Sequence, residues 1–290
     1  MKVINTIDRL PIRFMSEGHF DLSEWGKYMD TCVPGGKDKC LNDMKASGMS
    51  WEDDILPVQE NACANSTKRN ETVSVFTKVT AGLDARINEV FGKTLDADIY
   101  LYLGLCNGAG WVTDIGGRTT VLIGIEKVME LDWCDEDHMN GLILHELGHV
   151  YQGQYGILKT ETKTAQDRFI WQLFTEGVAM VFEQELVGDK EYFHQDKDGW
   201  KKWCDENFTY IADTFRKDLP DMTRETQRYF GDWVSFEGRG DVGYYLGTRF
   251  VRYMTKKEEF DNIICYDIER VKYKFDGFIG ENICKKQERE

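Results

Sequence analysis

The segment that most constrains the fold of this chain is GLILHELGHVYQ, residues 141–152. On an α-helix, residues four apart lie one turn apart on the same face, so His145 and His149 point in the same direction. The same helix has a second, apolar stripe, which predicts packing against a hydrophobic core: Met139, Ile143, Leu147 and Val150. Because burying imidazoles without a partner is costly, the histidine face needs a compensating group.

A metal ion would be such a group. Two imidazoles one turn apart have the spacing to bind one ion, and Glu146 lies about 100° around the helix from His145. Its carboxylate can therefore sit beside the metal and take a proton from a coordinated water. The alternative interpretation is a pair of solvent-facing helix histidines, against which the apolar surroundings argue.

A third ligand is expected, because zinc in hydrolytic sites takes three protein ligands and keeps one position open. Glu176 is the single carboxylate in the apolar run 169–182, and a metal ion would compensate its charge. Gly177 and Ala179 on this segment, and Gly148 on the first, predict close approach of the two helices. Alternatively, Glu176 faces solvent at the helix edge.

A competing metal pattern, HExxHxxGxxH, takes its third ligand from a histidine shortly after the first two. In this chain Gln152 stands where that pattern has glycine, and Tyr155 stands where it has histidine. The sequence therefore excludes that class of site.

The rest of the chain predicts an α+β protein that is mostly helical. Helical periodicity extends to about residue 95, with a capped helix start at Asp21 and a longer helix from the high sixties to Phe91. Segments 99–103 and 119–125 are predicted to be strands. The glycine-rich region between them predicts a hairpin or a strand connection, and not a phosphate loop, because a strand follows it. Further helices are expected at 136–153, 167–187, 198–216 and 241–255.

Three motifs together resemble the gluzincin-type zinc metallopeptidases, in particular bacterial families of predicted Zn-dependent proteases. They are the HExxH helix, the TEGVA helix at 175–179, and DVGYYLGTRFV at 241–251, so the resemblance covers about residues 98–255. It implies a thermolysin-like zincin core: a small sheet with an edge strand over the HExxH helix, followed by a helical subdomain. It also implies that His145, His149 and Glu176 are zinc ligands and Glu146 the base.

The resemblance further suggests a tyrosine near residue 244 that faces the metal and stabilises the oxyanion. Tyr244 is favoured because Tyr245 lies nearer the apolar stripe of its helix; the alternative is that the tyrosine only packs. Segment 119–125, taken as the edge strand, would hold a peptide or protein substrate by main-chain hydrogen bonds. One departure from the family pattern is Met180, which stands where some relatives have a carboxylate.

Domain boundaries are expected near residues 95 and 255: an N-terminal helical region (1–95), the metallopeptidase core (96–255) and a C-terminal extension packed on the core (256–290). The net charge of −15 disfavours nucleic acid and anionic membranes as partners. No signal peptide or membrane span is visible, which favours a cytoplasmic protein with reduced cysteines. His19, His138 and His194 lie in charged surroundings and are expected at the surface or at helix caps.

The sequence thus predicts a zinc-dependent metallohydrolase, specifically a peptidase that uses a zinc-bound water activated by Glu146. One alternative is a non-catalytic zinc-stabilised binding or regulatory protein, whose metal is closed off by a fourth protein ligand such as Cys134. The other is a zinc amidohydrolase that acts on a non-peptide substrate.

Overall fold

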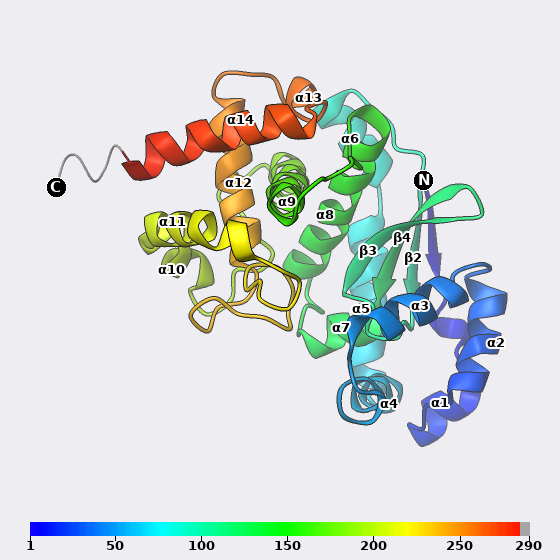
Figure 1. Ribbon diagram of the computed structural model, residues 1–290. Coiled ribbons are helices and arrows are strands. Elements are labelled where there is room, and N and C mark those ends of the chain that lie inside the picture. The colour runs from blue at the N-terminus through cyan, green and yellow to red at the C-terminus, as the bar shows by residue number, and fades with distance from the viewer. Residues whose placement is uncertain (285–290) are drawn as a thin grey trace. The chain divides into compact units, whose positions relative to one another are not determined.

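The structure of the protein is a computed structural model that describes residues 1–284 (Figure 1). It divides into two compact units, Met1–Glu146 and Leu147–Glu290, which we call the first and the second unit. The division falls inside one continuous helix, α8 (Glu136–Tyr155). The boundaries expected near residues 95 and 255 stay a prediction.

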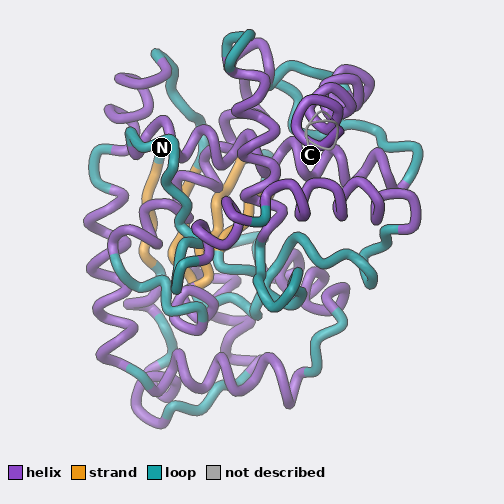
Figure 2. The backbone as a smooth tube through the Cα atoms, turned by 90° about the vertical axis from the view of Figure 1, so that its left-hand side faces the viewer, coloured by secondary structure: helices purple, strands orange, loops and turns teal. Residues whose placement is uncertain are grey.

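The first unit contains a mixed sheet of four strands, drawn in orange in Figure 2. Their order is β1-β2-β4-β3. Strands β1 (Lys2–Asn5), β2 (Asp98–Tyr102) and β4 (Arg118–Gly124) run parallel, and β3 (Gly110–Ile115) is antiparallel to β4. With the many helices of both units, this confirms the predicted α+β class, mostly helical.

The position of β4 corrects one prediction. Segment 119–125 was expected at the edge of the sheet, but β4 lies between β2 and β3, and β3 is the antiparallel edge strand. Residues 107–117 were expected to form a hairpin or a strand connection, and the hairpin is what the structure contains. Within this region, Gly110–Ile115 pairs along β4, with Val112 opposite Val121, because its aromatic and β-branched residues favour a strand.

Strand β1 was also not expected, because four residues at the N-terminus give too little periodicity to identify a strand. It lies beside β2, with Val3 opposite Ile99. The two strands that were predicted, β2 and β4, are buried on both faces, since neighbouring residues such as Leu122 and Ile123 are both inaccessible. Burial on both faces explains their continuous apolar runs.

Helices make up the rest of the first unit. They are α1 (Ile12–Glu17), α2 (Leu22–Cys32), α3 (Lys37–Ser47), α4 (Leu56–Ala64), α5 (Ser66–Thr80), α6 (Leu83–Phe91), α7 (Ile125–Glu130) and the first part of α8, with short turns at Ile7–Arg9 and Trp51–Ile55.

Two features of these helices were predicted from the sequence, one correctly and one not. The Asp21 side chain accepts a hydrogen bond from Glu24 N and caps α2, as predicted. The single helix expected up to Phe91 is wrong: it is divided into α5 and α6. The division occurs at Gly82, whose φ of +75° is a backbone conformation that glycine adopts readily and that ends helices.

Within its described residues, the second unit is helical. It contains the end of α8, then α9 (Ala165–Val187), α10 (Trp200–Glu206), α11 (Phe208–Asp218), α12 (Val242–Thr255), α13 (Phe260–Ile263) and α14 (Ile268–Ile279), with short turns at Leu219–Asp221 and Gly280–Cys284. The helix expected at 198–216 is two helices, which meet at Asn207. The helices expected at 167–187 and 241–255 are confirmed as α9 and α12.

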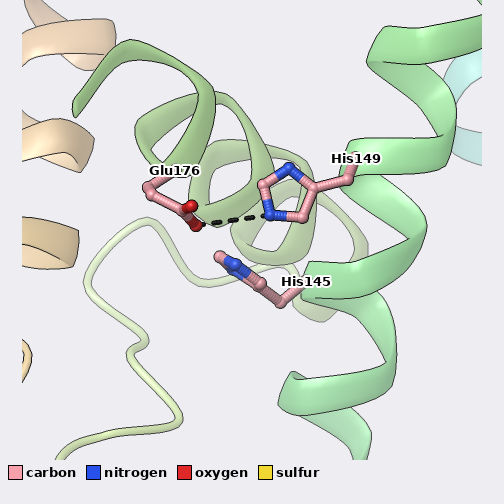
Figure 3. A group of neighbouring side chains, drawn as sticks. All are labelled: His145, His149 and Glu176. Carbon is pink, nitrogen blue, oxygen red and sulfur yellow. Dashed lines mark ion pairs between the residues drawn. The ribbon is translucent and has the colours of Figure 1, made fainter. Parts of the chain in front are cut away.

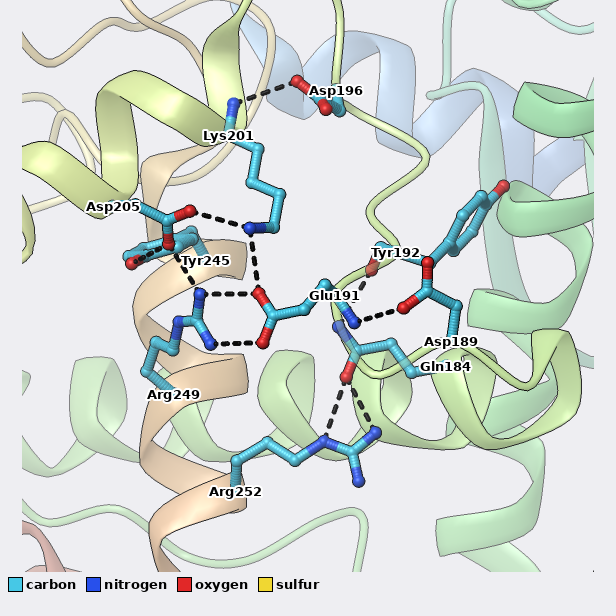
Figure 4. Close-up of polar contacts among 10 residues, drawn as sticks. All are labelled: Gln184, Asp189, Glu191, Tyr192, Asp196, Lys201, Asp205, Tyr245, Arg249 and Arg252. Carbon is cyan, nitrogen blue, oxygen red and sulfur yellow. Dashed lines mark hydrogen bonds and ion pairs between the residues drawn. The ribbon is translucent and has the colours of Figure 1, made fainter.

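A charged network ties the end of α9 to α10 and α12 (Figure 4). Arg249 on α12 forms ion pairs with Glu191 and with Asp205 of α10, and Arg252 donates to Gln184 on α9. These side chains hold the segment after α9 against the helices.

None of the described helices is both long enough and apolar enough to cross a membrane. Seven cysteines are free thiols, and of these Cys265 is the exposed one.

Candidate metal centre

Helix α8 buries the apolar stripe that the sequence predicted. Met139, Ile143, Leu147 and Val150 are each at most 1% exposed. His145 is also buried, and the His149 side chain is 15% exposed. The alternative of two solvent-facing histidines is therefore wrong.

Three potential ligands lie together: His145 and His149 on α8, and Glu176 on the neighbouring helix α9 (Figure 3). One donor atom from each lies within 4.8 Å of the others, and His149 Nε2 is 3.3 Å from Glu176 Oε2. The Glu176 side chain is 16% exposed and points toward the imidazoles, so it does not face solvent at the helix edge. This group could hold a metal ion.

One pair of donors has the spacing expected around a single ion. Two donor atoms that are each about 2.0–2.1 Å from a tetrahedral metal ion lie about 3.3 Å apart, and the distance between His149 and Glu176 has this value. Two imidazole nitrogens and one carboxylate oxygen are also a donor set found in metallohydrolases.

Small residues bring α9 close to α8. A β-carbon added at Gly148 would lie 2.7 Å from the Ala179 Cα and 3.0 Å from its carbonyl oxygen, so only glycine allows this approach. The predicted role of Gly148 and Ala179 is confirmed. As a result, His149, which follows Gly148 on α8, comes within ligand distance of the Glu176 carboxylate on α9.

Gly177 does not serve that contact, which corrects the prediction. Its missing β-carbon faces α12, where an added atom would lie 2.2 Å from the Gly247 carbonyl oxygen. A β-carbon added at Gly247 would likewise lie 2.5 Å from Leu173 O on α9. Helix α9 therefore has close backbone contacts with two helices, α8 and α12.

Glu146 lies against the start of the edge strand β3 within the first unit. The added β-carbon at Gly110 would lie 2.7 Å from Glu146 Oε1 and 2.8 Å from its Cγ. Glu146 itself is only 6% exposed. A glycine at this position thus leaves the space that the Glu146 carboxyl group occupies.

Asp241 is a further carboxyl group whose charge interacts with that of Glu176, and the sequence did not identify it. It precedes α12 with a φ of +57°, and its Oδ1 accepts a hydrogen bond from Gly231 N at 3.2 Å. Burial raises the pKa of Asp241 to about 6, and the negative charges of Asp232 and Glu176 act in the same direction. The available signal was its position at the start of an expected helix, which is typical of capping and not of metal sites.

The two candidate tyrosines have different surroundings. Tyr245 is buried and donates its hydroxyl to Asp205 Oδ1 at 2.8 Å, so its polar group serves the charged network (Figure 4). The Tyr244 ring packs edge-on against Phe230, with centroids 5.9 Å apart. Phe230 also fills the place where a β-carbon of Gly243 would be, 2.4 Å away. The role of Tyr244 at the metal stays a prediction.

His194 is not at the surface, contrary to expectation. It is buried, and its Nδ1 lies 2.9 and 3.0 Å from the two carboxyl oxygens of Glu183, a buried residue of α9. The polar residues around His194 suggested exposure, but its partner lies eleven positions earlier in the chain. His19 is exposed, and His138 bonds Asp135 at the start of α8, as expected.

No family model, curated protein or solved structure matches the chain. The assignment of the centre therefore depends on the donor geometry and on the sequence motif.

Proposed function

We propose that this protein is a zinc-dependent metallohydrolase that cleaves peptide bonds. The observation that carries the proposal is the convergence of His145, His149 and Glu176, whose donor atoms lie within 4.8 Å of one another. Glu146, next to His145 on the same helix, adds a carboxylate suited to act as a base.

The donor set favours zinc. Two imidazoles and a carboxylate, with a remaining position for water, are the ligands of hydrolytic zinc sites. Bound zinc lowers the pKa of a water ligand to about 7 and polarises the substrate carbonyl.

The residues of the chain then perform the proton transfers. Glu146 takes a proton from the attacking water as the water oxygen bonds to the carbonyl carbon of the substrate. It passes that proton to the leaving nitrogen as the C–N bond breaks, which yields a carboxyl group and an amine. Tyr244 would donate a hydrogen bond to the carbonyl oxygen as negative charge develops there.

The edge strand suggests how a peptide binds. Strand β3 is the antiparallel edge of the sheet, and its first residue, Gly110, lies beside Glu146. An extended peptide that pairs with β3 by main-chain hydrogen bonds would pass the base. A mixed sheet with such an edge strand, an HExxH helix and a helical unit after it is also the arrangement of a thermolysin-like zincin core, which we propose for this chain.

Metal analysis and digestion of a broad peptide library test the proposal together. We expect one zinc per chain, activity that a chelator abolishes, and a loss of about 10²–10⁴-fold in kcat for Glu146→Gln with zinc retained. Full activity in Glu146→Gln would remove the proposed mechanism.

A structural zinc site is the second candidate, and it requires a fourth protein ligand. Among the described residues, the group that could hold a metal contains three ligands, and Cys134 is not one of them. The Cys134 thiol instead donates to Val128 O at 3.7 Å. A coordination count on the zinc-loaded protein distinguishes the two candidates, and substrate profiling distinguishes a peptidase from a hydrolase of non-peptide amides.

A further inference from the structure

The first unit buries a carboxyl group for which the proposed reaction has no use. Glu126, in the first turn of α7, is fully buried. Its Oε2 accepts a hydrogen bond from Gly104 N at 2.8 Å, and its Oε1 accepts one from Cys106 N at 3.2 Å. Burial raises the pKa of Glu126 to about 7, although these hydrogen bonds act in the opposite direction. Because burying a carboxyl group costs free energy, we looked for a role that would explain its position.

Both hydrogen bonds come from one loop, residues 103–109, which connects β2 to the edge strand β3. Other residues hold the same loop: Trp25 Nε1 donates to Leu103 O, and Asn107 Nδ2 donates to Cys40 O. Cys106 has a φ of +58°, which is unfavourable for a residue with a β-carbon. The loop thus has a strained conformation that its hydrogen bonds maintain.

Two glycines make the space for the carboxyl group. A β-carbon at Gly104 would lie 2.5 Å from Glu126 Oε1, and one at Gly124 would lie 3.1 Å from the same oxygen. The Gly124 atom would also lie 2.9 Å from Gly108 O. The fit between Glu126 and the loop therefore depends on glycine on both sides.

The loop ends at the residue that lies against Glu146, the candidate base. Gly124 N donates to Ala109 O at 2.9 Å, and the next residue, Gly110, is the one that lies against Glu146. All of these contacts lie in the first unit. A shift of the loop at Gly104 to Cys106 would therefore move the start of β3 relative to the Glu146 carboxyl group.

We propose that Glu126 is a positioning residue: by holding the amides of Gly104 and Cys106, it keeps Gly110 of the edge strand against Glu146. This inference rests on the proposed function, because the catalytic value of the contact depends on Glu146 acting as the base. Glu126 itself does not take part in proton transfer.

The test is Glu126→Gln, which keeps the size of the side chain but replaces one acceptor oxygen with a donor. The matched control is Glu89→Gln on α6 of the same unit, where the side chain is exposed. Hydrogen exchange of the metal-free protein reports the loop directly, and kcat, KM and zinc content report the site. Glu126→Asp, which retains the charge but withdraws the oxygens by one methylene, is measured in the same way if the glutamine variant does not fold.

We expect the exchange rate of residues 104–110 to rise about tenfold or more in Glu126→Gln, because the loop opens more readily. We expect kcat to fall on the order of 10- to 100-fold, because small displacements of catalytic groups slow the reaction, with zinc content unchanged. The control should match the wild type in every measurement.

Unchanged exchange in the Glu126 variant overturns the inference, as does raised exchange with an unchanged kcat. If the wild type hydrolyses no peptide, the proposed function fails, and the exchange measurement on its own supports or overturns the positioning of Gly110 by Glu126.

Discussion

In the first unit, the Glu126 carboxyl group is fixed by hydrogen bonds from a loop, whereas in the second unit the Glu176 carboxyl group is placed by the packing of helices. Helix α9, which carries Glu176, meets the backbones of α8 and α12 through Gly148 and Gly177. The position of the Glu126 carboxyl group depends on hydrogen-bond donors and on its protonation state. The position of the Glu176 carboxyl group depends on glycines, which leave no side-chain volume between the helices.

This difference implies different sensitivities. A hydrogen-bonded carboxyl in a closed site responds to pH, because burial penalises its charged form. A carboxyl placed by close helix packing responds to added atoms, because packed backbones cannot move apart without loss of contacts. Substitutions at carboxyls and glycines of both units can break or sharpen this contrast.

The largest expected effect is on metal binding. Glu176→Gln removes the charged donor of the candidate centre, and we expect zinc affinity to fall more than about 100-fold, beyond the loss caused by residues that only support the ligands. Competition with a chromophoric chelator measures it. Glu185→Gln, which changes a carboxyl of α9 that pairs with Arg252, is the control and should retain affinity. Equal affinity of the two variants would contradict the centre.

The next effect concerns pH. Glu126 has an ordinary pKa of 4.5 and a folded pKa of about 7, so between these values the folded state binds more protons than the unfolded state. The free energy of unfolding of the protein should therefore decrease by about 3 kcal/mol in total as pH rises from about 4.5 through 7, and this contribution should level off about one pH unit above the folded pKa. Urea unfolding at several pH values measures the slope. Glu126→Gln should lack this part of the slope, and an identical slope would contradict the assignment.

Added volume in the second unit comes third. Gly177→Ala places a methyl group 2.2 Å from the Gly247 carbonyl oxygen, so we expect a loss of about 1–3 kcal/mol in the free energy of unfolding. The control is Gly153→Ala at the exposed end of α8, where the nearest side-chain atom would be 3.5 Å away. That variant should gain about 0.5–1 kcal/mol, because alanine is the better helix former. Thermal unfolding distinguishes the expected loss of stability from the expected gain. A Gly177→Ala protein as stable as the wild type would contradict the close packing of α9 and α12.

The smallest effect is expected at a carboxyl that neither burial nor close packing holds. Glu191 pairs with Arg249 and Lys201 in the charged network, but its side chain is 55% exposed. Glu191→Gln should lower the free energy of unfolding by less than about 1 kcal/mol, and added salt should reduce this difference. A larger loss of unfolding free energy that salt does not change would show that this exposed carboxyl contributes to stability as the buried ones do.

Features that follow from local periodicity were predicted well from the sequence. The apolar stripe of α8, the spacing of His145 and His149, and the carboxylate of Glu176 depend on helical repeats within short segments, and the described residues confirm that these three side chains lie together. The small-residue contact of Gly148 was also correct, because glycine destabilises a helix interior and therefore indicates close backbone packing there.

The features that were missed depend on partners distant in the chain. The edge position of β3 follows from its pairing with β4, and the burial of His194 follows from Glu183. The direction of Gly177 depends on Gly247, seventy positions later. Glu126 gave no signal, because its donors are backbone amides, which every residue type except proline carries.

The exposed thiol of Cys265 offers experimental access to the second unit. It donates to Tyr155 O, the last residue of α8, and the other six free cysteines are less accessible. Among these seven cysteines, a maleimide fluorophore should therefore label the folded protein at this position first. Its emission would report movement at the C-terminal end of the helix that carries both imidazoles, without any engineered residue.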